Sequence, residues 1–293
     1  MNYVEPFHFI LGAAPFDWTA DEEQSHEILN SFFCGGGQLV DTSDSYGKSE
    51  IFIGNSGLSP KLSLISKVGD KVGSKGLGKS NIEQSIDKSL NNLKVDALDY
   101  YFAHIDDLSL SPEQIYFNFL DLITGKYIKS AGLSNFSDSR LNSILEIQKR
   151  EGIKVFSVVQ YGYSVVSREY VEKQILPILV AHNIKLMSFF SLGKGFLTDK
   201  YGVLSKKTDF DLAHGGTGNS EYRTLKNFLI KKKVKKLSLK YNCTLQEIAL
   251  SFINKQQFVL SPIAGVRNAQ QLSQLMKRII LSTDDEAYLK SGI

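Results

Sequence analysis

Short apolar runs alternate with amphipathic segments along almost the whole chain, and this alternation limits the fold more than any other feature. The runs are rich in Ile, Leu, Val and Phe, which is typical of parallel strands buried on both faces. The expected strands are residues 9–11, 38–40, 62–66, 98–103, 130–133, 155–160, 184–190 and 258–262. Eight strands that alternate with helices predict a single-domain (β/α)8 TIM barrel over residues 1–293 and argue against a doubly wound open sheet.

The segments between the strands have helical periodicity. Helices are expected at about residues 21–33, 81–93, 112–124, 138–150, 169–182, 222–240 and 245–254, with a last one starting near Asn268. Residues 201–221 are polar and rich in glycine, which predicts a mobile loop. The basic run from Lys231 to Lys236 falls within an expected helix. It is interpreted as a solvated helix surface, because the flanking sequence lacks the interleaved aromatics of a nucleic-acid site.

The composition excludes several classes of function. Hydrophobic residues make up 42% and charged residues 22% of 293 residues, the profile of a globular protein with a sizeable core. The net charge of +3 is too weak to indicate a nucleic-acid partner. No apolar stretch of about 18 residues and no signal sequence is found, so no membrane partner is expected. Cys34 and Cys243 lack metal-ligand spacing and cannot form a disulfide framework, which predicts no metal and a cytoplasmic location.

Polar residues follow three successive expected strands. Asp41 comes directly after the second strand, and Tyr46 lies in the polar turn that follows. Lys67 ends the third strand, and His104 ends the fourth. The carboxyl ends of the strands of an α/β barrel meet at one rim, where catalytic residues lie. We therefore expect these four side chains to lie close together.

These four residue types suit the reduction of a carbonyl group. A free phenol has a pKa near ~10, and a lysine ammonium beside it favours the phenolate and lowers that pKa. A carboxylate such as Asp41 would keep Lys67 charged in a partly buried site. Tyr46 is then predicted to act as a general acid toward the oxygen, while His104 orients the carbonyl and a cofactor gives hydride to carbon. Each residue alone would more often be structural, as a cap, a surface charge or a core histidine.

Four segments extend this pattern beyond the four side chains. They are Asp41-Thr42 with Tyr46-Gly47 and Ser49-Glu50, Ser66-Lys67-Val68, Ser89 to His104, and Gly132-Leu133-Ser134-Asn135-Phe136. They resemble the motifs of the aldo-keto reductase family, and the resemblance covers nearly the whole chain. It implies an NADPH-dependent oxidoreductase that reduces a small aldehyde, ketone or sugar-like carbonyl compound, or oxidises the corresponding alcohol.

The resemblance also implies contacts to NADP(H). Ser134, Asn135 and Gln160 would hold the nicotinamide carboxamide, and Phe189 would stack on the ring where the family usually has a tyrosine. Further contacts would come from the loops after the seventh and eighth strands, where Arg267 would favour the 2′-phosphate of NADPH. The full expected set is Ser134, Asn135, Gln160, Phe189, Ser191, Leu192, Gly193, Gly265, Arg267 and Gln271.

The sequence departs from the family pattern in two regions. Leu275 stands where the family commonly has an asparagine that reads the adenine, and Ala264 replaces a common proline. Weaker or different adenine contacts are therefore expected. The segment between Tyr46 and Lys67 is short, and no long loop precedes the end at Ile293, which predicts an open substrate pocket.

Two other functions remain open. Gly73 to Ser80 matches the G-x-x-x-x-G-K-S pattern of a phosphate-binding loop, with Lys79 for the phosphates and Ser80 for Mg²⁺. Such a P-loop NTPase is disfavoured because the pattern begins about seven residues after the strand instead of at its end. A flexible loop near the substrate mouth, with Ser80 capping the next helix, is the simpler interpretation. The third possibility is a cofactor-binding regulatory protein that has the same fold and works through a partner.

Overall fold

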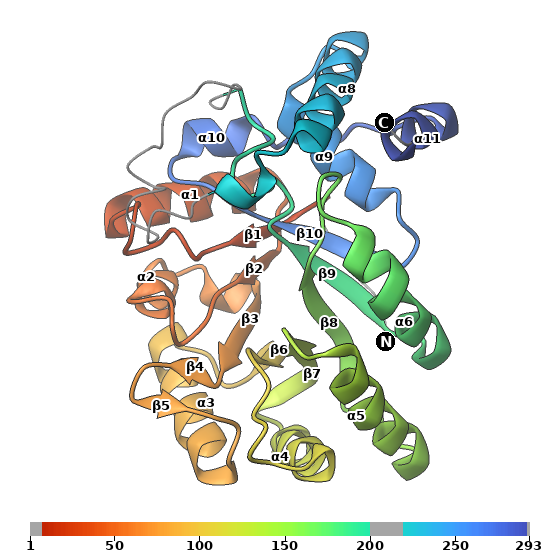
Figure 1. Ribbon diagram of the computed structural model, residues 1–293. Coiled ribbons are helices and arrows are strands. Elements are labelled where there is room, and N and C mark those ends of the chain that lie inside the picture. Colours follow the sequence, from red (N-terminus) through yellow and green to blue (C-terminus); the bar gives the residue numbers. More distant parts are fainter. Residues whose placement is uncertain (1–7, 200–218, 292–293) are drawn as a thin grey trace.

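Eight parallel strands close a barrel in the computed structural model, which describes residues 8–199 and 219–291 (Figure 1). In order around the barrel they are β1 (Ile10–Gly12), β2 (Leu39–Asp41), β3 (Ser63–Val68), β6 (Leu98–Ala103), β7 (Ile128–Ser134), β8 (Phe156–Gly162), β9 (Lys185–Phe189) and β10 (Val259–Gly265). β10 pairs back with β1, where Ile10 lies opposite Ile263. The (β/α)8 TIM barrel is confirmed.

Helices surround the barrel, and those that follow the main strands lie close to their expected positions (Figure 1). They are α1 (Glu22–Cys34), α3 (Lys79–Leu93), α4 (Pro112–Thr124), α5 (Asp138–Glu151), α6 (Leu176–His182), α8 (Leu225–Tyr241), α9 (Leu245–Asn254) and α10 (Ala269–Ser273). Two further helices, α2 (Ser49–Asn55) and α11 (Thr283–Lys290), were not expected from the sequence. Short 3-10 turns occur at η1 (Ser59–Lys61) and η3 (Ser220–Tyr222).

Capping boxes fix the starts of three of these helices. The side chain of Asp21 accepts a hydrogen bond from the Gln24 backbone, and the Gln24 side chain bonds back to the Asp21 backbone. The same reciprocal pair begins α4 at Ser111 and α9 at Thr244. Each box satisfies two backbone N–H groups that an α-helix leaves free at its first turn.

Helix 169–182 is interrupted where a continuous α-helix was expected. Residues Val171–Ile175 form a π-helical turn (η2), and α6 begins at Leu176. Pro177 lies in the first turn of α6, and proline has no N–H to give to an α-helical carbonyl. The π-helical turn is of the single-turn kind that occurs inside α-helices.

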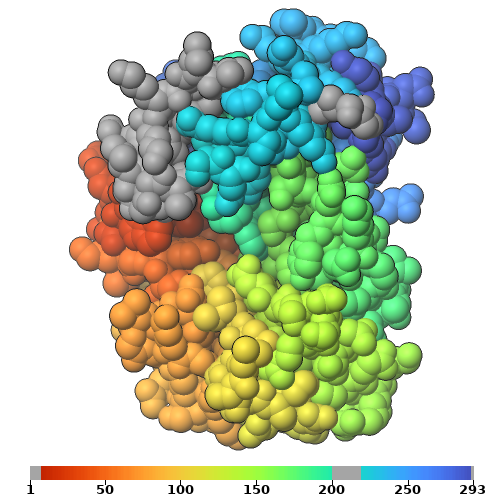
Figure 2. Space-filling view, in the orientation of Figure 1, coloured from red at the N-terminus to blue at the C-terminus, as the bar shows by residue number. Residues whose placement is uncertain are grey.

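The interior of the barrel is apolar. Six buried side chains from the strands fill it: Ile10, Ile65, Phe102, Val158, Met187 and Ile263. A larger cluster lies between the strands and the helices. Gly132 is required beside Phe102, because a Cβ built on it would collide with the Phe102 ring. Figure 2 shows the colours following one another around the face of the molecule, as a barrel of successive β/α units requires.

The phosphate-loop pattern Gly73 to Ser80 adopts a different structure. β4 (Asp70–Lys71) and β5 (Ser74–Lys75) form a two-stranded antiparallel hairpin that lies apart from the barrel in Figure 1. The Leu77 N–H donates to the Asp107 carboxylate at 2.8 Å, so a side chain already occupies a backbone donor of this loop. Lys79 lies in α3 and pairs with Asp121 at 2.6 Å. The expected cap at Ser80 is wrong, since α3 begins after Gly78.

The basic run on α8 is only partly solvated, contrary to the expectation. Lys231 Nζ donates to the carbonyl oxygens of Phe196 at 2.8 Å and of Thr198 at 2.6 Å. Burial lowers the pKa of Lys231 to about 8. Lys232 is exposed, as expected for the whole run. Lys231 therefore links α8 to the loop after β9 through hydrogen bonds.

Most of the polar segment 201–221 lies outside the described residues. Among the described residues, no helix combines the length and the apolar character needed to cross a membrane.

Candidate active site

The structure brings together the four residues expected at the strand ends. Lys67 Nζ lies 2.7 Å from Asp41 Oδ2 and 2.6 Å from the Thr42 carbonyl oxygen. The same nitrogen lies 4.8 Å from the centre of the Tyr46 ring. The rings of Tyr46 and His104 meet edge to face, with centroids 5.7 Å apart. The barrel explains these positions, because β2, β3 and β6 are successive neighbours around it and their carboxyl ends meet at one rim.

The central ion pair is deeply buried. The side chains of Lys67 and Asp41 are 2% and 6% exposed. Burial alone would lower the pKa of Lys67, but the charge of Asp41 and hydrogen bonds to Asp41 and Tyr46 raise it above its ordinary value. Lys67 is therefore an ammonium ion at neutral pH, which agrees with the expectation that Asp41 keeps it charged.

The pKa of Tyr46 differs from the expectation. Burial of the phenol is the strongest influence and raises its pKa above the ordinary value of 10. The Lys67 ammonium acts in the opposite direction, as expected, but does not outweigh burial. The predicted net lowering is therefore wrong, and Tyr46 carries its proton throughout the neutral range.

The imidazole of His104 is neutral, and a neighbouring hydroxyl group contacts its Nδ1 atom. Burial and the nearby Lys67 charge lower its pKa to about 3. Its Nδ1 atom lies 3.1 Å from Ser43 Oγ, and its carbonyl oxygen accepts a hydrogen bond from Asn135 Nδ2 at 3.0 Å. A neutral imidazole in this place leaves Nε2 for a substrate oxygen.

The residues expected at the nicotinamide lie beside this group. Ser134 and Gln160 are register partners on β7 and β8, so their backbones are adjacent. Asn135 follows in the left-handed conformation, with φ 60°, and its amide donates to Ser134 Oγ at 3.1 Å. Phe189 lies opposite Gly162 at the ends of β9 and β8 and is partly exposed. Amide and hydroxyl groups next to an aromatic face match the donors, acceptors and flat surface that a nicotinamide carboxamide needs.

The remaining residues expected at the cofactor lie in the loop after β9 and in the turn after β10. Ser191 is buried and donates to the Ser188 carbonyl at 2.9 Å, while Leu192 precedes Gly193, which has φ 57°. Gly265 ends β10 in an exposed position. The predicted pair after it is adjacent in space: the Arg267 backbone N–H donates to Gln271 Oε1 at 3.1 Å.

A sequence model of the Aldo/keto reductase family matches residues 8–291. The chain belongs to this family. An aldo-keto reductase of Alternaria alternata, AFTS1, is 23% identical to it over 94% of this chain and 84% of the relative. Membership of the family makes the protein an NAD(P)H-dependent oxidoreductase.

Two contacts of this aldo-keto reductase were missed in the sequence. Gln160 Nε2 donates to Asp41 Oδ1 at 2.8 Å, so this residue supports the ion pair in addition to its expected place at the cofactor. Ser43 holds the imidazole of His104. Gln160 is 119 positions from Asp41, and no spacing rule joins residues so far apart. Ser43 lies inside the stretch that carries the family motif, but its partner is known only from the fold.

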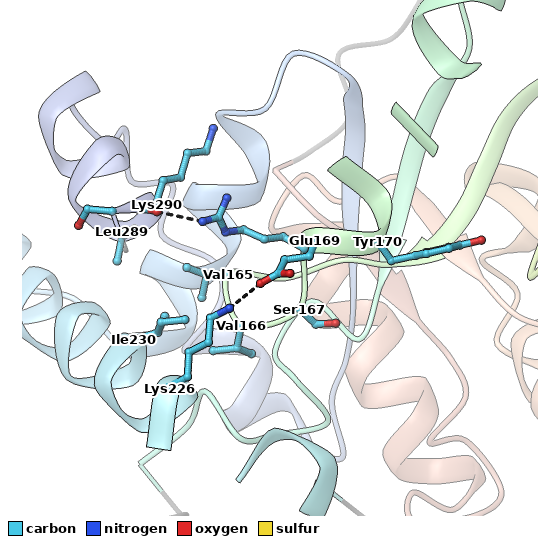
Figure 3. Close-up of a pocket in the computed structure, with 11 residues that line it drawn as sticks. Val165, Val166, Ser167, Glu169, Tyr170, Lys226, Ile230, Leu289 and Lys290 are labelled. Atoms are coloured by element: carbon cyan, nitrogen blue, oxygen red, sulfur yellow. Dashed lines mark hydrogen bonds and ion pairs between the residues drawn. The ribbon is translucent and has the colours of Figure 1, made fainter. Parts of the chain in front are cut away.

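A separate surface pocket of about 460 Å³ lies between the loop after β8, α8 and α11 (Figure 3). The tetrad of Asp41, Tyr46, Lys67 and His104 does not contribute to its lining. Its cations are already engaged. Lys226 pairs with Glu169 at 2.5 Å, as a dashed line shows. Arg168 donates to the Lys290 carbonyl oxygen at 2.9 Å.

Proposed function

We propose that this enzyme reduces a small aldehyde, ketone or sugar-like carbonyl compound, or oxidises the corresponding alcohol, with Tyr46 as the general acid and NADP(H) as the cofactor. The observation that carries the proposal is the buried Asp41–Lys67 pair, 2.7 Å apart, against the ring of Tyr46. When bound, the nicotinamide supplies the hydride that reduces the carbonyl carbon.

The chain itself supplies the proton and the orientation. Tyr46 is protonated at neutral pH because its phenol is buried, so it can donate to a carbonyl oxygen. Negative charge then develops on the phenol oxygen, and the adjacent Lys67 ammonium stabilises it. His104 is neutral and can donate a hydrogen bond to the same oxygen. Asp41 holds Lys67 in place, and Gln160 donates to Asp41.

The cofactor contacts rest on the position of each residue. Ser134, Asn135 and Gln160 would bind the carboxamide, with Phe189 against the ring. The segment Ser191 to Gly193 would follow the pyrophosphate. The turn after β10 is assigned to the adenine ribose, where Gly265, Arg267 and Gln271 lie; the guanidinium favours NADPH over NADH because it can pair with a 2′-phosphate.

Fluorescence titration tests cofactor binding. Trp18 is the only tryptophan, and its ring lies 6.4 Å from that of Tyr46. NADPH is expected to change its emission and ATP to leave it unchanged, and Trp18→Phe should remove the signal. A response to ATP alone would instead support the NTPase interpretation of Gly73 to Ser80.

Turnover of generic aldehydes tests the general acid. Tyr46→Phe is expected to lower kcat at least ~10²-fold, the lower end for removal of a general acid. Tyr127→Phe is the matched control, because this tyrosine is 42% exposed on the surface. Unchanged turnover in Tyr46→Phe would reject the role of the phenol. NADPH binding without turnover on a broad carbonyl panel would favour the regulatory protein.

A further inference from the structure

A buried carboxyl group lies in the turn directly after β2. Asp44 is 6% exposed, and its Oδ1 atom lies 3.4 Å from Ser43 Oγ. Its Oδ2 atom is buried and has no hydrogen-bond partner among the residues that the structure describes. A buried carboxylate that lacks partners is unfavourable, whereas a protonated carboxyl group needs fewer acceptor contacts and can itself donate. This environment therefore favours the protonated form.

Ser43 lies between this carboxyl group and the imidazole of His104. Its hydroxyl oxygen is 3.1 Å from His104 Nδ1 on one side and 3.4 Å from Asp44 Oδ1 on the other. A hydroxyl group carries one hydrogen, so Ser43 can donate to only one of these two acceptors at a time. His104 is neutral, so only one of its two ring nitrogens carries hydrogen. The direction of the Ser43 hydrogen bond therefore decides which nitrogen that is.

We propose that Asp44 is a positioning residue that selects the tautomer of His104 through Ser43. Protonated Asp44 donates to Ser43 Oγ, Ser43 donates to Nδ1, and the imidazole hydrogen lies on Nε2, where it can bind a carbonyl oxygen. When Asp44 loses its proton to solvent, Ser43 donates to the carboxylate, and Nδ1 must carry the hydrogen to bond Ser43. Nε2 then presents a lone pair, which accepts from an alcohol instead. The catalytic consequence rests on the proposed role of His104.

The charges around Asp44 place this change near physiological pH. Burial raises its pKa, as do the acidic groups of Glu50 on α2 and Asp70 on β4. Lys71 on β4 and the Ser43 hydrogen bond act in the opposite direction, and the pKa is about 6. The phenol of Tyr101 on β6 also lies within electrostatic reach. Mildly acidic pH therefore favours the tautomer that carries its hydrogen on Nε2, which can donate to a carbonyl oxygen.

Ser45 is the competing donor. Its hydroxyl lies 3.5 Å from His104 Nδ1 and 3.0 Å from Ser43 Oγ. If Ser45 bonded Nδ1 instead, the tautomer would not depend on Asp44. Ser43 is the stronger partner of Nδ1, because its oxygen lies 3.1 Å from that nitrogen and the Ser45 oxygen lies 3.5 Å from it.

NMR of the protein alone tests the tautomer directly. The protonated and unprotonated nitrogens of a neutral imidazole have well-separated 15N chemical shifts, and the His104 signals can be identified by their loss in His104→Gln. Across roughly pH 5 to 8 we expect the hydrogen to move from Nε2 to Nδ1. Asp44→Asn and Ser43→Ala should abolish the pH response, while Ser45→Ala should retain it. A constant tautomer in the unmodified protein, or an unchanged response in Asp44→Asn, would overturn the proposal.

The pH profile of turnover provides the second readout. Above the transition, kcat for carbonyl reduction should fall on the order of 10²-fold, the lower end for loss of one donor at a reacting oxygen. In Asp44→Asn, kcat should no longer fall across this pH range. The two readouts separate the two proposals. A tautomer change without turnover on any carbonyl compound would support the role of Asp44 and reject the proposed carbonyl reduction. Turnover with a fixed tautomer would reject the role of Asp44 alone.

Discussion

The buried ion pair makes a quantitative prediction about Asp41→Asn. Asparagine keeps the shape of the side chain and an oxygen for Gln160, so the change removes mainly the charge opposite Lys67. With Lys67 only 2% exposed, its ammonium would lose its counter-ion in a site that water does not reach. Breaking such a pair from one side costs about 3–5 kcal/mol. At about 2.1 cal/mol/K per residue over 293 residues, this corresponds to a fall in Tm of roughly 5–8 °C.

Equilibrium unfolding in denaturant measures this cost, and a double-mutant cycle isolates it. Lys67→Met alone should also destabilise, because it leaves the carboxylate of Asp41 without its partner. The double variant Asp41→Asn, Lys67→Met should recover most of the loss, which gives a coupling energy of at least about 3 kcal/mol. The penalty in Asp41→Asn should shrink at alkaline pH, where Lys67 can become neutral. Single and double losses that simply add would refute the reasoning.

Three further predictions concern other parts of the molecule. Asp44→Asn should raise the free energy of unfolding by about 3 kcal/mol near pH ~7.5 and leave it unchanged near pH ~3. The pKa of Asp44 is about 6 in the folded protein, above its ordinary value of 3.8. The stability that protonation gives is therefore complete below pH 3.8 and is lost as the pH rises through 6. Denaturant unfolding at both pH values checks the sign. Lys231→Met should lower the free energy of unfolding by about 2 kcal/mol because two hydrogen bonds are lost. Lys232→Met, at an exposed position, should leave it unchanged, and thermal unfolding of the two variants compares them. Arg267→Met should raise the Kd of NADPH roughly 10–100-fold but not that of NADH; equal losses in a binding titration would contradict a 2′-phosphate contact.

The barrel could be predicted because its signals are local and repeated. Each strand is a short apolar run, and each major helix has an apolar stripe or a capping residue close to it in sequence. The boundaries shifted where the signal is weak: β2 ends at Asp41, one residue later than expected. The hairpin β4–β5 could not be seen, because Gly73 and Gly76 suit both a phosphate loop and a turn with positive φ. Leu77, directly after the hairpin, donates to Asp107, which is thirty positions away in the sequence.

The proximity of the four residues at the strand ends could be predicted, but their electrostatics could not. The barrel rule places Asp41, Lys67 and His104 at one rim whatever fills the space between them. The sign of the shift at Tyr46 depends on how deeply the phenol is buried, which sequence spacing does not give. The cofactor contacts, the NADP(H) preference and the cytoplasmic location stay predictions.

The electrostatic balance of the site explains why a buried tetrad can remain both stable and reactive. Asp41 and Lys67 cancel each other in charge, so the centre carries no net charge that burial would penalise. Tyr46 and His104 are neutral for the same reason, since burial disfavours the charged form of each. A neutral imidazole, unlike an imidazolium, has a lone pair as well as a hydrogen, and its direction must be fixed by a neighbour. Burial thus creates the need for a neighbouring group that selects the tautomer, and of the two serine hydroxyls that contact Nδ1, Ser43 is the nearer.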